Sequence, residues 1–134
     1  MADKIGRRNI SSGAPWEPLV GYSRAVRVGQ FVAVSGSAAV GSDGELVGTG
    51  DPYAQAKQCI RVIEDSLAKA GAGLRDVVRT RTFVTDIELW PEIARAHREA
   101  FGDVMPATSM VEVTRLIDPA MLVEIEADAI VGPD

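Results

Sequence analysis

The sequence predicts an α+β fold in which one mixed β-sheet carries two helices on one face. Strands are indicated by two segments that alternate with period two, 106–113 and 123–129. Helices are indicated by two segments with apolar residues three and four positions apart, within 51–71 and 88–101. The 134 residues suit one domain, spanning residues 1–134.

The N-terminal part is expected to lack regular structure over its first 20 residues, where Ser11 to Pro15 break helices and strands. Two short strands follow between Arg24 and Ser35, joined by a turn. After a second turn at 41–44, Leu46-Val47 is a candidate short edge strand.

The first helix has recognisable ends. Asp51 can cap its N-terminus, Pro52 fits its first position, and Gly71 can stop it. Its apolar stripe consists of Ala56, Ile60, Ile63, Leu67 and Ala70. The second helix runs from about Glu88 to Phe101 and ends at Gly102.

A strand at Val77–Thr85 separates the two helices. Because two helices cover only one face of the sheet, its other face is expected to carry Thr80, Thr82, Met110 or their neighbours. An uncovered face with this many apolar groups usually meets another subunit. We therefore expect a homo-oligomer with binding sites where subunits meet.

Composition argues against several classes of function. Hydrophobic residues make up 46% of the chain, which argues against disorder, and the net charge of −5 argues against binding a phosphate backbone. The lone Cys59 forms no internal disulfide, and no signal peptide or membrane-spanning run is recognisable, so a cytoplasmic location is expected. One His and one Cys without ligand spacing predict that no metal is bound.

Glu124 is the best candidate for acid–base chemistry. Its strand places Glu124, Glu126 and Asp128 on one face and small apolar residues on the other. A carboxylate near a subunit interface has its pKa raised by desolvation and by neighbouring acids. The alternative role is a salt bridge to Arg79, Arg81 or Arg115.

His97 also has two interpretations. It shares a helix face with Ala94 and Phe101, which favours a packed, hydrogen-bonded ring over one that contacts a ligand. A Ser-His-Asp triad lacks a nucleophile-elbow motif, and no glycine-rich phosphate loop is present. Met105 and Met110 fit packing roles.

Several segments, in order from about residue 14 to the end, resemble the Rid family (YjgF-type, reactive intermediate deaminases). These segments are 21–26, 32–36, 71–78, 83–86, 106–113 and 123–127. The resemblance implies a chorismate-mutase-like fold and a homotrimer whose sheets form a central β-barrel, with three clefts between subunits. It also implies that no cofactor or metal is used.

In the active deaminases of this family, 2-imino acids are hydrolysed to 2-oxo acids and ammonia. An arginine in a Pro-Ala-Arg-Ser motif binds the substrate carboxylate, and a glutamate on the last strand positions or activates water. A tyrosine and a Ser-Gly segment line the cleft. The corresponding positions here are Thr108, Glu124, Tyr22, and Ser35 with Gly36.

Thr108 departs from the family pattern, since it offers one neutral hydroxyl in place of a forked cation. Losing that cation costs about two to three decades in rate or affinity. Arg24 replaces a glutamine, and it either supplies the missing cation or lies exposed. His97 replaces a tyrosine, which indicates a rebuilt pocket. Arg24, His97 and Met110 complete the candidate ligand contacts.

These residues favour a small-molecule site in an inter-subunit cleft, with Glu124 as a water-positioning acid/base. The substrate would be an imine- or enamine-type metabolite other than a simple 2-imino acid. One alternative is a ligand-binding or regulatory trimer without catalysis. Another is endoribonuclease activity, a label attached to parts of the family; the acidic charge and the lack of a paired catalytic histidine argue against it.

Overall fold

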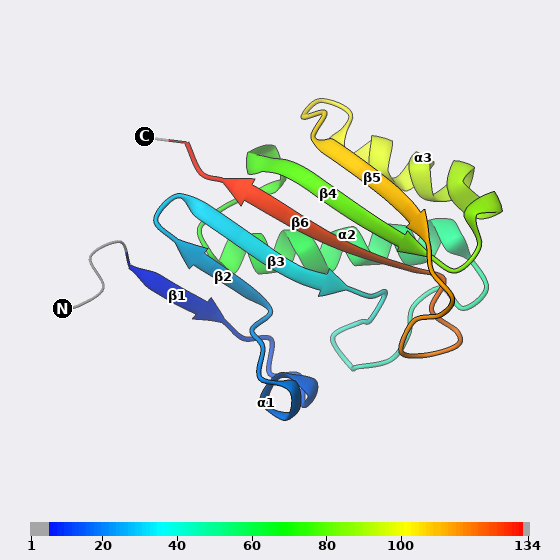
Figure 1. Cartoon of the computed structure of the whole chain (residues 1–134), viewed down its shortest axis with the longest axis horizontal. Coiled ribbons are helices and arrows are strands. Elements are labelled where there is room, and N and C mark those ends of the chain that lie inside the picture. The colour runs from blue at the N-terminus through cyan, green and yellow to red at the C-terminus, as the bar shows by residue number, and fades with distance from the viewer. Residues whose placement is uncertain (1–5, 133–134) are drawn as a thin grey trace.

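The computed structural model of the chain describes residues 6–132 and has two layers, a six-stranded sheet and two long helices on one of its faces (Figure 1). In chain order the elements are β1 Arg7–Ile10, α1 Trp16–Val20, β2 Ala25–Val28, β3 Phe31–Ser37, α2 Pro52–Lys69, η1 Leu74–Asp76, β4 Val77–Val84, η2 Ile87–Leu89, α3 Trp90–Phe101, β5 Ala107–Glu112 and β6 Val123–Ile130. The predicted α+β fold is confirmed.

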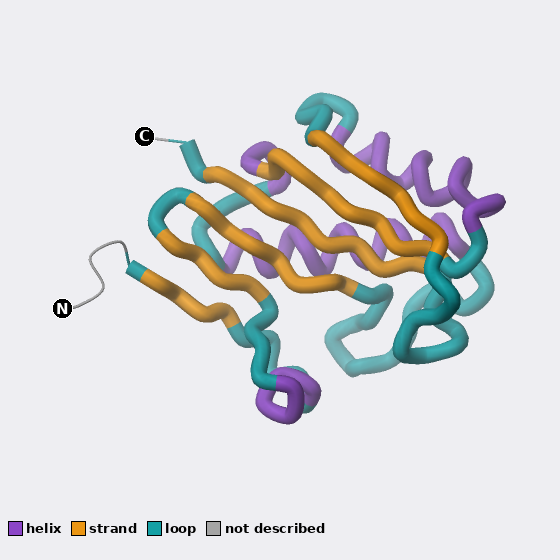
Figure 2. Tube along the Cα trace, in the orientation of Figure 1, coloured by secondary structure: helices purple, strands orange, loops and turns teal. Residues whose placement is uncertain are grey.

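The strand order in the sheet is β1-β2-β3-β6-β4-β5. Every neighbouring pair is antiparallel except β4 and β5, which are parallel. Figure 2 shows α2 and α3 behind the sheet and α1 beyond the ends of β1 and β2. No helix among residues 6–132 combines the length and apolar composition that a bilayer span requires.

The long helices begin for the reasons that the sequence indicates. The Asp51 carboxylate accepts a hydrogen bond from the Ala54 amide at 3.0 Å, and Pro52 occupies the first turn of α2. Beyond the end of α2, Gly71 adopts a left-handed φ of 78°. α3 starts at Trp90, later than expected, because the 3-10 turn η2 occupies residues 87–89.

β6 lies inside the sheet and shows the predicted alternation. Its helix-facing side chains are fully buried, whereas the acids between them are half-buried on the opposite face. The buried residues are Val123, Ile125, Ala127 and Ala129. The residues of α2 and α3 that form the core with them include Ala56, Cys59, Ile60, Ile63, Leu67, Ile93 and Phe101.

The expectation that Thr80 and Thr82 lie on the uncovered face is wrong. Both are buried under the helices, at 0% and 2% exposure. Both faces of β4 mix polar and apolar side chains, so the sequence does not show which face meets the core. Pairing with β6 decides this, and the pairing of the two strands is irregular between Val77 and Arg79. Met110 also packs against the core. Exposed apolar residues of the uncovered face include Phe31, Val111 and Ile130.

The expectation of an irregular N-terminal region is wrong for much of residues 6–20, and its first five residues lie outside the described part. β1 pairs antiparallel with β2, and α1 follows. β1 is mostly polar, and part of its support comes from the Arg8 guanidinium, which donates to the Lys69 carbonyl at 2.7 Å. The Lys69 carbonyl is distant from β1 in sequence, so the residues around β1 do not indicate this bond. Leu46-Val47 forms no strand; Leu46 makes only an isolated bridge with Val40.

Candidate functional site

The register between β4 and β6 leaves Glu124 without a basic partner. Arg79 lies opposite Asp128 and Arg81 lies opposite Glu126, but Phe83 lies opposite Glu124. The Arg81 Nη1 atom is 3.2 Å from the carboxylates of both Glu126 and Asp128. Across residues 6–132, no arginine, lysine or histidine nitrogen comes within 4.0 Å of the Glu124 carboxylate. The salt bridge considered as its alternative role is therefore not formed.

The Glu124 carboxylate rests directly on Gly36 of β3. A Cβ atom added to Gly36 would overlap Glu124 Oε2 and would lie 3.0 Å from Glu124 Cδ. The pairing of β3 with β6 is irregular between Val34 and Ser37, so the backbone bulges where the carboxylate sits. Gly36 is therefore needed for this close approach, because any larger residue would occupy the place of the carboxylate.

Arg24 is anchored beneath this bulge, and the expectation that it lies exposed is wrong. Its Nη2 atom donates to the Ser35 and Gly36 carbonyls at 2.6 and 2.7 Å and to Ser37 Oγ at 3.2 Å. Its Nε is buried and finds no acceptor among the described residues. Burial lowers the pKa of Arg24, although the electrostatic effects of Tyr22, Glu17 and Glu124 act in the opposite direction.

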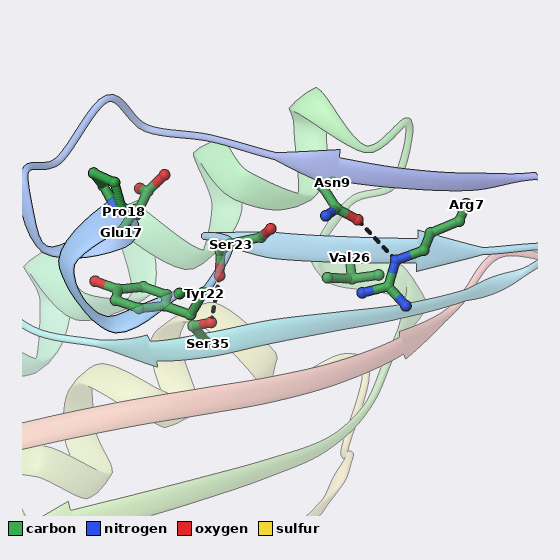
Figure 3. A pocket seen from close by; sticks show the side chains of 9 residues that line it. Arg7, Asn9, Glu17, Pro18, Tyr22, Ser23, Val26 and Ser35 are labelled. Carbon is green, nitrogen blue, oxygen red and sulfur yellow. Dashed lines mark hydrogen bonds between the residues drawn. The ribbon is translucent and has the colours of Figure 1, made fainter.

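Beside Arg24, the sheet and α1 enclose an open hollow of about 490 Å³ (Figure 3). Tyr22 and Ser35 both line it, and Ser35 Oγ donates to the Ser23 carbonyl at 2.7 Å. The remaining lining residues are Arg7, Asn9, Glu17, Pro18, Gly21, Ser23 and Val26. The lining is therefore mostly polar, with apolar side chains from Pro18 and Val26.

Glu17 holds the wall of this hollow in place, and sequence reasoning missed it. Its carboxylate accepts hydrogen bonds from Ser11 Oγ at 2.7 Å, Ser12 N at 3.1 Å and Ser12 Oγ at 2.5 Å, and the residue is only 6% exposed. Burial acts to raise the pKa of Glu17, but the hydrogen bonds from Ser12 and Ser11 outweigh it, and the pKa is lowered. The signal in the sequence was the pair Ser11 and Ser12, which precede Glu17 by six and five residues and can donate to its carboxylate.

Thr108 belongs to a separate hydrogen-bonded cluster on the helix-facing side. Thr80 Oγ1 lies 2.9 Å from His97 Nε2 and 2.7 Å from Thr108 Oγ1, and Thr108 Oγ1 donates to the Thr80 carbonyl at 3.2 Å. The His97 ring also packs on Phe101, with 4.7 Å between centroids. Burial lowers the pKa of His97, so the neutral ring is favoured.

Within one chain the candidate residues therefore form two groups. Those near β2, β3 and β6 are Tyr22, Arg24, Ser35, Gly36 and Glu124. Those on the β5 side are His97, Thr108 and Met110. Thr108 lies opposite Thr80 and Thr80 lies opposite Ala127, so Thr108 is two strands away from β6 and on the other face from Glu124.

Glu124 has an unusual electrostatic environment for a carboxylate. Burial raises its pKa, the positive charge of Arg24 acts to lower it, and Glu126 adds to the rise. A half-buried carboxylate with a raised pKa and no ion-pair partner takes up a proton from water or a ligand more readily than an ordinary carboxylate does. Among residues 6–132, no group of three or more metal-ligating side chains gathers at one place.

The fold is that of a known class of small α+β proteins. The crystal structure of Rv2704 from Mycobacterium tuberculosis, described as a member of the YjgF/YER057c/UK114 family, superposes with a TM-score of 0.86 and is 52% identical. The alignment covers 94% of this chain and all of that one. The family model described as Endoribonuclease L-PSP matches residues 12–131. The chain belongs to this Endoribonuclease L-PSP family, also called the YjgF or Rid family.

Two relatives extend the comparison. The uncharacterized protein SCO2049 of Streptomyces coelicolor is 38% identical over 125 residues, which cover 93% of this chain and 92% of that protein. The 3-aminoacrylate deaminase RutC of Acinetobacter baylyi is 32% identical over 120 residues, covering 90% and 94% of the two chains. The family therefore includes proteins named as deaminases as well as the endoribonuclease label of its model.

Proposed function

We propose that this protein is a Rid-family hydrolase that deaminates an imine- or enamine-type metabolite other than a simple 2-imino acid. The observation that carries the proposal is the Glu124 carboxylate, half-buried over Gly36 and without an ion-pair partner among residues 6–132. The name of the Acinetobacter baylyi relative supports the substrate class, because 3-aminoacrylate is an enamine.

In the proposed reaction Glu124 moves protons for an attacking water. An enamine first takes a proton from solvent at carbon and becomes an iminium. Water oxygen then bonds to the iminium carbon while the C=N electrons move to nitrogen, and Glu124 accepts the proton that water loses. Glu124 returns this proton to nitrogen and takes the hydroxyl proton as the C=O bond forms and the C–N bond breaks. The departing ammonia receives that last proton and leaves as ammonium.

The identity of residue 108 supports a substrate without a carboxylate at the usual place. The Thr108 hydroxyl is neutral and is already bonded to Thr80. Replacing a bidentate guanidinium by a hydroxyl removes about 3 kcal/mol of carboxylate binding, or roughly two decades. The group that approaches Thr108 is therefore proposed to be neutral.

We also propose a homotrimer in which the ligand binds in a cleft between subunits. The exposed apolar side chains of the uncovered face support an oligomer, and β5 is an exposed edge strand. The two separate groups of candidate residues support a composite site. One subunit supplies Tyr22, Arg24, Ser35, Gly36 and Glu124, and the next supplies His97, Thr108 and Met110.

Ammonia release from 3-aminoacrylamide, an enamine without a carboxylate, and from 2-iminobutyrate tests the proposed reaction. We expect wild type to prefer the enamine, Glu124→Gln to lose at least about a hundredfold in kcat/KM, and Thr108→Arg to gain about tenfold or more on 2-iminobutyrate. Matched controls are Glu126→Gln, the next acid on the same face, and Thr114→Arg, an exposed threonine given the same charge. Strong wild-type turnover of 2-iminobutyrate would contradict the proposed specificity.

Mixed trimers test the composite site. Glu124→Gln and Thr108→Trp chains are each expected to be inactive alone, the second because the indole blocks the cleft. Assembled together, some clefts would combine an intact Glu124 with an intact Thr108 from another chain, so activity should return. No recovery would show that each site lies within one chain. Ligand binding without turnover in every variant would favour a regulatory trimer, and Glu124-dependent RNA cleavage would favour the ribonuclease role.

A further inference from the structure

Arg24 is a largely buried cation whose positive charge has no acid within ion-pair distance in the described chain. Its guanidinium is instead fixed by three acceptors of β3, the carbonyls of Ser35 and Gly36 and the hydroxyl of Ser37. A buried charge without a partner is costly, so its retention needs a reason. A guanidinium bound to several backbone acceptors is also rigid, because its donors have a fixed planar geometry.

The same peptide links Arg24 to Glu124. Gly36 presents its carbonyl to Arg24 and its Cα to the Glu124 carboxylate, and this contact is closer than any Cβ would allow. The β3–β6 ladder is irregular between Val34 and Ser37, the stretch that Arg24 binds. A bulge leaves backbone groups outside the ladder, and here Arg24 takes up two of the carbonyls in that stretch.

We infer that Arg24 is a positioning residue for Glu124, because it fixes the Ser35–Ser37 bulge on which the carboxylate rests and supplies the positive charge that favours its ionised form. The role as a base rests on the proposed function, but the position and charge of Glu124 can be measured without any substrate. Arg24 would then act through Glu124 and through the backbone, with no direct contact to the reacting atoms.

The charged groups around Glu124 make this role specific. Glu126, two residues along β6, opposes ionisation of Glu124, and Arg81 is occupied by Glu126 and Asp128. β4 places the uncharged Phe83 opposite Glu124, and β3 places Gly36 beneath it. On the helix side, the charge of Glu124 adds to the rise that burial produces in the pKa of the Cys59 thiol. Arg24 is therefore the cation that offsets burial at Glu124.

The experiment follows the Glu124 carboxyl carbon by NMR during a pH titration of the full-length protein. Arg24→Gln should shift the Glu124 titration to higher pH and change the amide signals of Ser35 to Ser37. Arg24→Lys keeps the positive charge but lacks the planar set of donors of a guanidinium. It should therefore shift the Glu124 titration less than Arg24→Gln does, while still changing the amide signals of Ser35 to Ser37. Arg27→Gln is the matched control, because Arg27 also binds backbone carbonyls, those of Gly29 and Ala70, but not in the bulge.

Activity gives a second readout. In Arg24→Gln the acidic limb of the kcat/KM profile should move to higher pH, with about a tenfold loss at its acidic end. An Arg24→Gln protein that folds with unchanged Glu124 titration and unchanged bulge signals would overturn the inference. If Arg24→Gln does not fold, an Arg24→Lys protein with wild-type bulge signals would overturn it equally. A wild type without deaminase activity would instead contradict the proposed function, and the titration would still decide the role of Arg24.

Discussion

Gly36→Ala is the sharpest single test of the site, because the structure fixes what the added methyl group meets. Its Cβ would overlap Glu124 Oε2 and approach Glu124 Cδ to 3.0 Å and Cγ to 3.4 Å. No backbone atom is among the nearest neighbours, so the carboxylate is the group that must move. Restoring ordinary contact distances requires the carboxylate to swing by about 1 Å.

The two consequences of this swing differ in size. The fold should lose only about 1 kcal/mol, the low end for overpacking, since a half-buried side chain can turn toward solvent. Catalysis should fall by roughly a hundredfold in kcat, because a misplacement of about 1 Å is that costly for a group that positions a reactant. Ammonia release on the best enamine substrate measures the second effect, and thermal unfolding measures the first.

Gly132→Ala is the control, because a Cβ there meets nothing within 4 Å. It should leave both kcat and the melting temperature unchanged. A Gly36→Ala protein with wild-type kcat would refute the reasoning that the Glu124 carboxylate must rest on Gly36. A loss of kcat that accompanies a large loss of stability would also refute it, because the reasoning predicts a displaced carboxylate in a protein that is otherwise nearly as stable as wild type.

Two further predictions concern the groups around the site. Glu17→Gln should destabilise the fold by about 2 kcal/mol near neutral pH, since a charged acceptor of three hydrogen bonds is lost. The pKa of Glu17 is lowered in the fold, so its contribution to stability is present above the ordinary carboxyl pKa and is lost as the pH falls through the pKa in the folded protein. The difference in melting temperature between Glu17→Gln and wild type should therefore shrink in acid. Glu64→Gln, at an exposed position, is the control and should leave the melting temperature unchanged. Thr80→Val should lower the free energy of unfolding in denaturant by about 1–3 kcal/mol, because His97 Nε2 loses its partner and Thr108 Oγ1 loses its bond to the Thr80 hydroxyl. Thr114→Val should be near neutral. Equal losses in the two variants would contradict a structural role for the cluster.

Local patterns in the sequence predicted much of the sheet and both long helices. The alternation in β6 names the core residues because neighbouring side chains of a strand point to opposite faces. Asp51 and Pro52 mark the start of α2 because a cap satisfies backbone groups only a few residues away. Glu124 could also be singled out from sequence, as the first acid of the acidic face of β6.

Partners distant in the chain account for what could not be predicted. β1 depends on pairing with β2 and on the Lys69 carbonyl, which lies far along the chain. The buried state of Thr80 and Thr82 depends on the register of β4 with β6. The sequence could not decide between a cation in the site and an exposed Arg24, because nothing near it in sequence shows that β3 offers three acceptors to its guanidinium.

The sequence by itself determined the two long helices, the strands between and after them, most of the apolar core and the neutral residue at position 108, since each depends on side-chain type and short-range periodicity. Only the tertiary structure decided that Glu124 faces Phe83 and Gly36 instead of an arginine, and that Thr108 and Glu124 lie on opposite faces of one chain. The physical reason is strand register: a shift of one residue exchanges the two faces of a strand, and register is set by pairing across the whole sheet.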